Sequence, residues 1–210
     1  MKKVRADIKE RIIAEAKTAF LKNGFSKVNT QNLAISLGIS KRTLYEYFPS
    51  KENLLEEIID RDLKDIKRHV NSIVREMKED NSNFLLNLKK LWNIMSKTSC
   101  TFTKEFFEDI KRFSPKQWEK IENFRAKQIK SNFTKLHSIG VSMGVIKSNI
   151  NKDIFYLIYY NSLHNILVPE VLSDLPITNQ EAIQNIIDVL LTGSLTEQGK
   201  NEYENLDFSK

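Results

Sequence analysis

Apolar residues recur at helical spacing along most of the chain, and the residues that break helices fall between these periodic segments. Only six Gly and four Pro occur in 210 residues. No stretch alternates between apolar and polar residues for long enough to indicate a sheet. The pattern predicts an all-α fold, with helices near 7–22, 31–37, 41–48, 51–80, 83–98, 102–113, 115–139, 152–168 and 179–192. The polar tail after Gly193 is compatible with a short helix or with disorder.

Residues with known capping preferences predict where these helices begin and end. Side chains of Ser, Thr and Asn accept hydrogen bonds from the free amides of a first helical turn. Gly and Pro end helices, because Gly adopts a left-handed conformation and Pro lacks an amide hydrogen. The expected N-caps are Thr30, Ser40, Ser50, Asn151 and Thr178. The expected ends and turns are at Gly24, Gly38, Pro49, Gly140 and Gly144.

The net charge of +6 is distributed unevenly along the chain. Residues 1–51 hold 11 Lys and Arg against 4 Asp and Glu, which gives a net charge of +7. Residues 150–210 hold 3 Lys and Arg against 9 Asp and Glu, a net charge of −6. A basic end beside an acidic end indicates a polyanionic partner for the first and a different task for the second.

The stretch from Thr30 to Leu55 contains two short predicted helices joined by Gly38-Ile39-Ser40. Gly38 permits a sharp reversal of the chain, Ile39 can fill the angle between the helices, and the small side chain of Ala34 lets the two backbones approach closely. These are the requirements of a helix-turn-helix.

The second helix of this motif has two distinct faces. Leu44 and Phe48 are four residues apart and are expected to face inward, whereas Lys41, Arg42 and Tyr45 share an outer face. A short helix of this kind suits the major groove of DNA, which is about 12 Å wide. Arg42 or Lys41 could donate to guanine O6 and N7. A single Lys or Arg on a helix is, however, usually only solvated.

Phosphate contacts are expected beside this face. Thr43 and Tyr47 form a third stripe of the helix and could donate to phosphates. The amides that begin the helices at Gln31 and Lys51 favour anions through the helix dipole. Thr30 and the Lys51 ammonium would reinforce them. The alternative for Tyr45 and Tyr47 is an ordinary half-buried packing role.

The string Ser40-Lys-Arg-Thr-Leu-Tyr-Glu-Tyr-Phe-Pro-Ser-Lys-Glu-Asn-Leu54, preceded by Ala19-Phe20, Gly24-Phe25, Thr30 and Leu33-Ala34, resembles the TetR family of bacterial regulators over about residues 8–59. The resemblance implies a homodimer that binds a palindromic operator on double-stranded DNA and represses transcription until a small-molecule effector occupies its C-terminal domain. It also implies that Thr30, Thr43, Tyr47 and Lys51 contact phosphates, and that Lys41, Arg42 and Tyr45 approach bases. We therefore expect a three-helix DNA-binding domain at 1–50, and an effector-binding and dimerisation domain at 51–210.

The C-terminal two-thirds offers candidates for a ligand pocket and for a dimer interface. Aromatic residues are concentrated in 84–136, where the resemblance implies an effector pocket and where core packing is the alternative. The pocket candidates are Trp92, Phe102, Phe106, Phe107, Trp118 and Phe124. The helices near 152–168 and 179–192 are more apolar than one-sided burial requires. The interface candidates are Ile154, Ile158, Ile183, Ile186, Ile187 and Leu190, although these helices could instead only cover the monomer core.

Other functional classes find little support in the sequence. We expect no enzyme, because no phosphate-cradling Gly loop occurs and Cys100 has no recognisable activating context. No metal or other cofactor is expected, since the three His lack ligand spacing, and no apolar run is long enough to span a membrane. A cytoplasmic location is the simplest expectation. The alternative function is an architectural DNA-binding protein without an effector.

Overall fold

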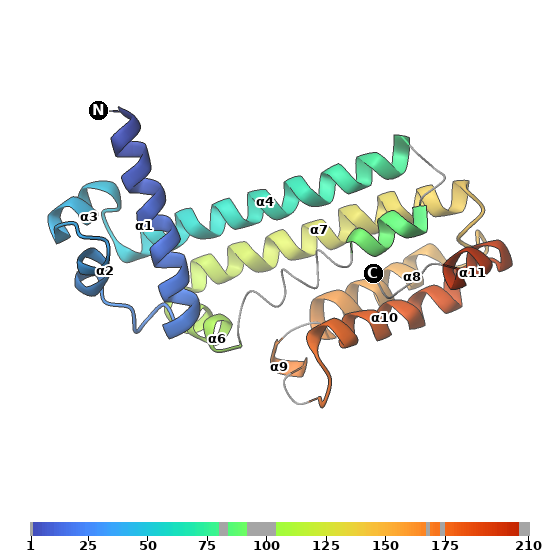
Figure 1. Ribbon diagram of the computed structural model, residues 1–210. Helices are drawn as coiled ribbons and strands as arrows, with labels where there is room; N and C mark the ends of the chain where they lie inside the picture. The colour runs from blue at the N-terminus through green and yellow to red at the C-terminus, as the bar shows by residue number, and fades with distance from the viewer. Residues whose placement is uncertain (1, 80–83, 92–103, 167–168, 173–174, 206–210) are drawn as a thin grey trace. The chain divides into compact units, whose positions relative to one another are not determined.

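The computed structural model describes residues 2–79, 84–91, 104–166, 169–172 and 175–205, and these form an all-α fold (Figure 1). Within them, the closest approach to sheet pairing is one isolated bridge between Ile146 and Leu195. Residues 84–91 are also helical. The named helices are α1 (Lys2–Asn23), α2 (Thr30–Ser36), α3 (Lys41–Tyr47), α4 (Lys51–Glu79), α6 (Lys104–Phe113), α7 (Pro115–Ser142), α8 (Lys152–Asn161), a π-helix (Ser162–Ile166), α9 (Pro169–Leu172), α10 (Asn179–Ser194) and α11 (Glu197–Glu204).

The chain divides into two compact units, and α4 and α7 each contribute residues to both. The N-terminal unit comprises residues 1–65 and 101–122, and the C-terminal unit comprises 66–100 and 123–210. The three-helix domain expected at 1–50 is therefore only part of the first compact unit. The boundary between the two compact units falls inside α4 and α7, because each of these long helices packs against different neighbours at its two ends.

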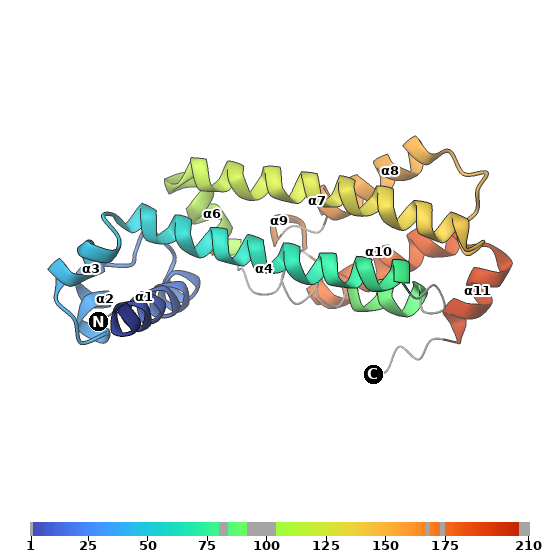
Figure 2. The ribbon, with the colours of Figure 1, turned by 90° about the horizontal axis from the view of Figure 1, so that it is seen from above.

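In the N-terminal unit, α1, α2 and α3 gather around the first turns of α4 (Figures 1 and 2). Apolar residues four positions apart on α1 are buried, with Ile12, Ala16 and Phe20 at most 1% exposed. The same core takes in Leu54 and Leu55 from α4, together with residues of α6 and α7. The helix-turn-helix is thus held by apolar contacts that extend well beyond residue 50.

The caps in this unit match the sequence expectations with one exception. Ser40 caps α3 by accepting a hydrogen bond from the amide of Thr43 at 2.9 Å. Gly38 adopts the left-handed conformation, with φ of +67°, that the turn requires. The prediction that Thr30 caps α2 was wrong, because Asn29 is the cap and accepts from the Gln31 amide at 2.7 Å. Thr30 is instead the first residue of α2.

In the C-terminal unit, two predicted caps are confirmed and one predicted turn is absent. Asn151 caps α8, and Thr178 forms a reciprocal capping box with Glu181 at the start of α10. Gly140 does not interrupt α7, which continues to Ser142, whereas Gly144 does turn the chain with φ of +70°. The tail after α10, for which the sequence left two alternatives, forms α11.

Gly140 lies at a close contact in the core of the C-terminal unit. A Cβ atom at this position would lie 2.5 Å from Cδ1 and 2.7 Å from Cγ1 of Ile146, and 3.1 Å from Cζ of Phe84. Carbon atoms in contact are normally separated by about 3.5–4.0 Å. Ile146 and Phe84 are themselves buried. The sequence therefore has a glycine at this position because the surrounding core leaves no room for a side chain, and not because the chain turns here.

We predict that Gly140→Ala lowers the free energy of unfolding by about 1–3 kcal/mol, because the added methyl overpacks a filled core. The matched control is Gly193→Ala in α10, where nothing lies within 4 Å of the added Cβ. That substitution should stabilise the protein by about 0.5–1 kcal/mol, since Ala loses less backbone entropy in a helix. Urea unfolding of both variants checks the pair. Equal changes in the two variants, or a larger loss of stability in Gly193→Ala than in Gly140→Ala, would contradict the close-packing explanation.

Candidate nucleic-acid interface

Helix α3 presents its polar face to solvent because its apolar face is anchored in the core. Leu44 and Phe48 are 2% and 5% exposed. Lys41, Arg42 and Tyr45, predicted for the opposite face, are all exposed. The structure therefore brings the three predicted base-contacting side chains to one accessible surface, which we call the α3 outer face.

The side chains of the α3 outer face contact one another and their surroundings. The guanidinium of Arg42 donates from Nε to Oε1 of Glu46 at 3.1 Å, and the Arg42 side chain remains 90% exposed. The ammonium of Lys41 lies 5.8 Å from the centroid of the Tyr45 ring. Exposed ion pairs of this type contribute only about 0–1 kcal/mol. Arg42 can therefore leave Glu46 for a stronger partner at little cost.

Three of the predicted phosphate-contacting residues, Thr30, Gln31 and Thr43, lie in the first turns of α2 and α3 and have hydrogen-bond partners there. The hydroxyls of Thr30 and Tyr45 lie 3.1 Å apart, which joins the start of α2 to the α3 outer face. The hydroxyl of Thr43 lies 2.8 Å from that of Ser40. Gln31 is exposed, although its amide already donates to Asn29. The Thr30 hydroxyl thus contacts the α3 outer face, and the Thr43 hydroxyl contacts the residue that caps α3.

Tyr47 and Lys51 are partly buried, and both contact other parts of the protein. Tyr47 is half-buried and packs against the core of the N-terminal unit. The ammonium of Lys51 donates to the carbonyl oxygens of Phe25, Ser26 and Val28, at 2.9, 3.2 and 3.2 Å. It also lies 4.5 Å from the centroid of the Phe25 ring. An ammonium has three N–H donors, so those of Lys51 are all used within the protein.

Ion pairs between α1 and α4 hold the two helices against each other. The guanidinium of Arg61 bonds to Glu10 and Glu57, and Lys9 lies 3.3 Å from Glu57. The hydrogen bond from Arg61 lowers the pKa of the Glu57 carboxyl below its usual value. A further pair joins Lys17 to Asp62 at 2.6 Å. The pairs that join α1 to α4 link residues 45 to 51 positions apart, and no local pattern in the sequence indicates these pairs, whereas Arg61 and Glu57 are only four residues apart within α4.

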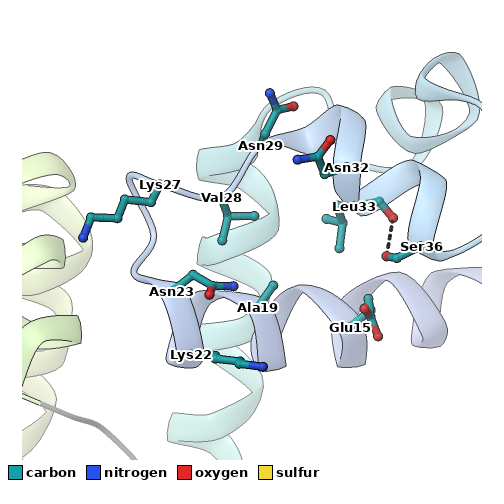
Figure 3. Close-up of a pocket in the computed structure, with 10 residues that line it drawn as sticks. All are labelled: Glu15, Ala19, Lys22, Asn23, Lys27, Val28, Asn29, Asn32, Leu33 and Ser36. Carbon is teal, nitrogen blue, oxygen red and sulfur yellow. Dashed lines mark hydrogen bonds between the residues drawn. The ribbon is translucent and has the colours of Figure 1, made fainter.

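A groove of about 650 Å³ separates the C-terminal half of α1 from the loop that follows it and from α2 (Figure 3). The groove is lined mainly by polar side chains, which are three asparagines, two lysines, one glutamate and one serine. Three apolar side chains complete the lining. The lining residues are Glu15, Ala19, Lys22, Asn23, Lys27, Val28, Asn29, Asn32, Leu33 and Ser36. Sequence reasoning did not identify this groove, because it depends on how the loop folds back between the helices.

The four predicted pocket residues that the structure describes do not line the cavity found in the C-terminal unit. Trp92 and Phe102 lie outside the described residues. Phe106 is buried in the N-terminal core, where Phe107 and Trp118 pack against it, and Phe124 is partly buried. The described cavity of the C-terminal unit has a volume of about 40 Å³. Its lining is almost entirely apolar: Phe84, Leu88, Phe133, Leu136, His137, Ile146, Phe155, Tyr159, Leu163, Ile187, Leu190 and Leu191.

The predicted interface residues separate into exposed and buried groups. Ile154 and Ile158 of α8 are 55% and 52% exposed. In α10, Ile186 and Leu190 are partly buried. Ile183 and Ile187 are only 3% and 2% exposed within the monomer, so these two belong to its core rather than to an available interface. The difference arises because α10 is apolar on more than one face, and the sequence does not say which face is inside.

Neither a metal centre nor a membrane crossing is indicated in the part of the chain that the structure describes. No group of three or more His, Cys, Asp or Glu side chains there is placed to hold a metal ion. None of its helices has the length and apolar character needed to cross a membrane.

Comparison with known proteins relates the chain to bacterial regulators. Residues 12–58 match the family described as bacterial regulatory proteins, tetR family. The chain is 26% identical over 190 residues to an uncharacterized HTH-type transcriptional regulator, YvaF, of Bacillus subtilis. The alignment covers 90% of this chain and 96% of that protein. A match to the nucleoid occlusion factor SlmA of Haemophilus ducreyi, at 36% identity, covers 25% of this chain and 26% of that protein.

Solved structures extend the likeness in fold to nearly the whole chain. A putative transcriptional regulator from Saccharomonospora viridis, solved in complex with choline, superposes with a TM-score of 0.70 at 17% identity. The superposition covers 91% of this chain and all of that one. At this identity, the likeness concerns the fold alone.

We predict that Glu46→Gln strengthens binding to random-sequence duplex DNA by up to about fivefold, the equivalent of an exposed ion pair. The substitution removes a negative charge beside the α3 outer face and frees Arg42. Fluorescence anisotropy measures the affinity. The control, Glu197→Gln, breaks a similar exposed pair with Lys200 in α11 and should leave affinity unchanged. Weaker binding by Glu46→Gln would show that Arg42 needs this partner.

Proposed function

We propose that this chain, whose residues 12–58 match the tetR family of bacterial regulatory proteins, is a dimeric, sequence-specific repressor. In this proposal it binds a palindromic operator and is released by a small-molecule effector. The observation that carries the proposal is the α3 outer face, where Lys41, Arg42 and Tyr45 are exposed on a rigidly anchored helix. We assign DNA binding to residues 1–50, and effector binding and dimerisation to 51–210.

The contacts with DNA follow from the positions of the side chains. Arg42 and Lys41 have donors for guanine O6 and N7, and Tyr45 lies beside them. Thr30, Gln31 and Thr43 carry uncharged donors around this face and would bind phosphates, with Tyr47 adding its hydroxyl. The net charge of +7 over residues 1–51 favours association with the polyanion. Phosphate contacts would set the register, and base contacts would set the sequence preference.

Dimerisation is supported by an apolar stripe on α8 that the monomer leaves uncovered. Ile154, Leu157 and Ile158 lie three and four residues apart and are each more than half exposed. Val189 of α10, at 75%, and Ile166 of the π-helix are exposed as well. Contiguous exposed apolar residues on a helix are typical of a protein interface. A second copy of the chain is the proposed partner.

Release by an effector is supported at the level of the fold and by the apolar cavity of the C-terminal unit. A cavity of about 40 Å³ is close to the share of liquid volume that one water occupies, roughly 30 Å³. A larger effector would therefore displace lining side chains as it binds. Lining by Phe, Leu and Ile favours an apolar molecule, and the imidazole of His137 and the phenol of Tyr159 supply polar groups in that lining.

Selection from a pool of random duplexes tests the proposed function. We expect wild-type protein to enrich a two-fold-symmetric site. Arg42→Ala should change the bases preferred at one position of each half-site, because a bidentate Arg–guanine contact contributes about 1–3 kcal/mol of discrimination. Flat enrichment by the wild-type protein would favour the architectural alternative. An unchanged preference with uniformly lower affinity would assign Arg42 to phosphates instead.

We predict that Ile158→Asp converts the proposed dimer into a folded monomer, because it places a charge in the middle of an apolar interface. Light scattering after size exclusion reports the mass, and circular dichroism reports the fold. The control is Ile35→Asp, at a residue that is 65% exposed on α2 and should leave the dimer intact. A wild-type protein that elutes as a monomer would rule out this interface.

A further inference from the structure

The loop between α1 and α2, residues 24–29, determines where α2 begins. Gly24 ends α1 in the left-handed conformation, with φ of +85°, and its amide donates to the carbonyl oxygen of Phe20 at 2.9 Å. Asn29 closes the loop as the N-cap of α2. Thr30 follows at once and contacts Tyr45 of the α3 outer face. Any shift of this loop therefore moves the residues that border the proposed DNA contacts.

Lys51 holds the loop from the side of α4. Its ammonium donates to the carbonyl oxygens of Phe25, Ser26 and Val28, at 2.9–3.2 Å, and lies over the Phe25 ring. Three carbonyl oxygens that point toward one cation cannot separate without losing a charge-assisted hydrogen bond. The first residue of α4 is thus bonded to the carbonyl oxygens of three of the six loop residues.

Asp109 of α6 holds the same loop through other atoms. Its Oδ2 accepts from the Ser26 amide at 2.6 Å, and its Oδ1 accepts from the Ser26 hydroxyl at 2.6 Å. A Cβ on Gly24 would lie 3.3 Å from Oδ2, so the carboxylate lies directly against the loop. Helix α6 is itself anchored, because Phe106 and Ile110 are buried in the same core as α1 and α4.

We infer that Lys51 and Asp109 are positioning residues for DNA binding, which hold the loop before α2 from two sides without contacting DNA. This inference rests on the proposed DNA-binding function and changes the role expected for Lys51. It also gives α6, which lies outside residues 1–50, a direct effect on the DNA-binding surface. The structural observation behind it is the convergence of an ammonium and a carboxylate on the carbonyls and the amide of one short loop.

The charge of Asp109 gives a test in which two explanations predict opposite signs. Removing a negative charge from a DNA-binding protein strengthens its attraction to the polyanion. If Asp109 positions the loop, Asp109→Asn instead weakens binding to a random-sequence duplex by about tenfold, the effect of losing a hydrogen bond to a charged group. The control is Glu108→Gln, at an exposed neighbour on α6, which should bind as wild type or slightly more tightly.

Two further variants separate positioning from a purely structural role. Ser26→Ala removes only the hydroxyl that donates to Asp109, and it should reduce affinity in the same direction at a temperature where both proteins are folded, as shown by circular dichroism. The double variant with Asp109→Asn should lose little further affinity, because both substitutions disrupt the same contact between Ser26 and Asp109. If the variants lower only the melting temperature and leave affinity at 25 °C unchanged, Asp109 is not a positioning residue.

The salt dependence of binding distinguishes a positioning role for Lys51 from a phosphate contact. A side chain that neutralises one phosphate contributes about 0.9 to the slope of log affinity against log salt concentration. We expect Lys51→Met to lower affinity about tenfold, as for a lost charge-assisted contact, while the slope stays unchanged. The comparison is the slope of the wild-type protein, measured over the same range of salt concentrations.

Each outcome of these measurements decides a separate question. A slope reduced by about 0.9 in Lys51→Met would return Lys51 to the phosphate contacts and overturn the inference for that residue. Affinity at wild-type level or above in Asp109→Asn would overturn it for Asp109. If wild-type protein fails to bind duplex DNA at all, the proposed function itself is wrong.

Discussion

The DNA-binding surface depends on the apolar core that α1, α2 and α3 share with the first turns of α4 and with α6. Helices α2 and α3 have seven residues each, and isolated helices shorter than about 12–15 residues are marginal in water. Their stability must come from the burial of residues such as Leu33, Leu44 and Phe48, each contributing about 1.5–3 kcal/mol. The partners in that core include Leu55 and Ile110. A chain cut at residue 50 would keep the motif but lose much of the core that fixes it.

Local patterns predicted the helices of this protein well because helix formation here follows local rules. The spacing of Leu44 and Phe48 predicted the buried face of α3, and the cap at Ser40 follows from its position before a short amphipathic run. The error at the start of α2 is also local. Asn29 and Thr30 are both good N-caps, and only the backbone conformation, extended at Asn29, decides between them.

Contacts between residues far apart in the sequence could not be predicted from local patterns. Ser26 and Asp109 are 83 positions apart, and the three carbonyl acceptors of Lys51 carry no side-chain signature. Gly140 was expected to turn the chain, since a glycine that packs against Ile146 and one that turns look the same in a sequence. Which face of an all-round apolar helix such as α10 is buried is equally a property of its neighbours. The exposed site was predictable, whereas the contacts that position it were not.

The length of α3 explains why the proposed function requires a second copy of the chain. Seven residues span roughly 10 Å at 1.5 Å per residue, the length of about three base pairs at 3.4 Å each. Two cations on the α3 outer face, at about 1–3 kcal/mol of discrimination per bidentate contact, supply about 2–6 kcal/mol. This covers at most the lower part of the roughly 4–10 kcal/mol that typically separates specific from non-specific binding. Two copies double the readout, provided that both recognition helices enter the groove about 34–36 Å apart. Two heads that bind one DNA together must keep a fixed spacing, so small shifts of either recognition surface would weaken binding. The loop before α2 therefore affects affinity, because this loop determines where α2 begins.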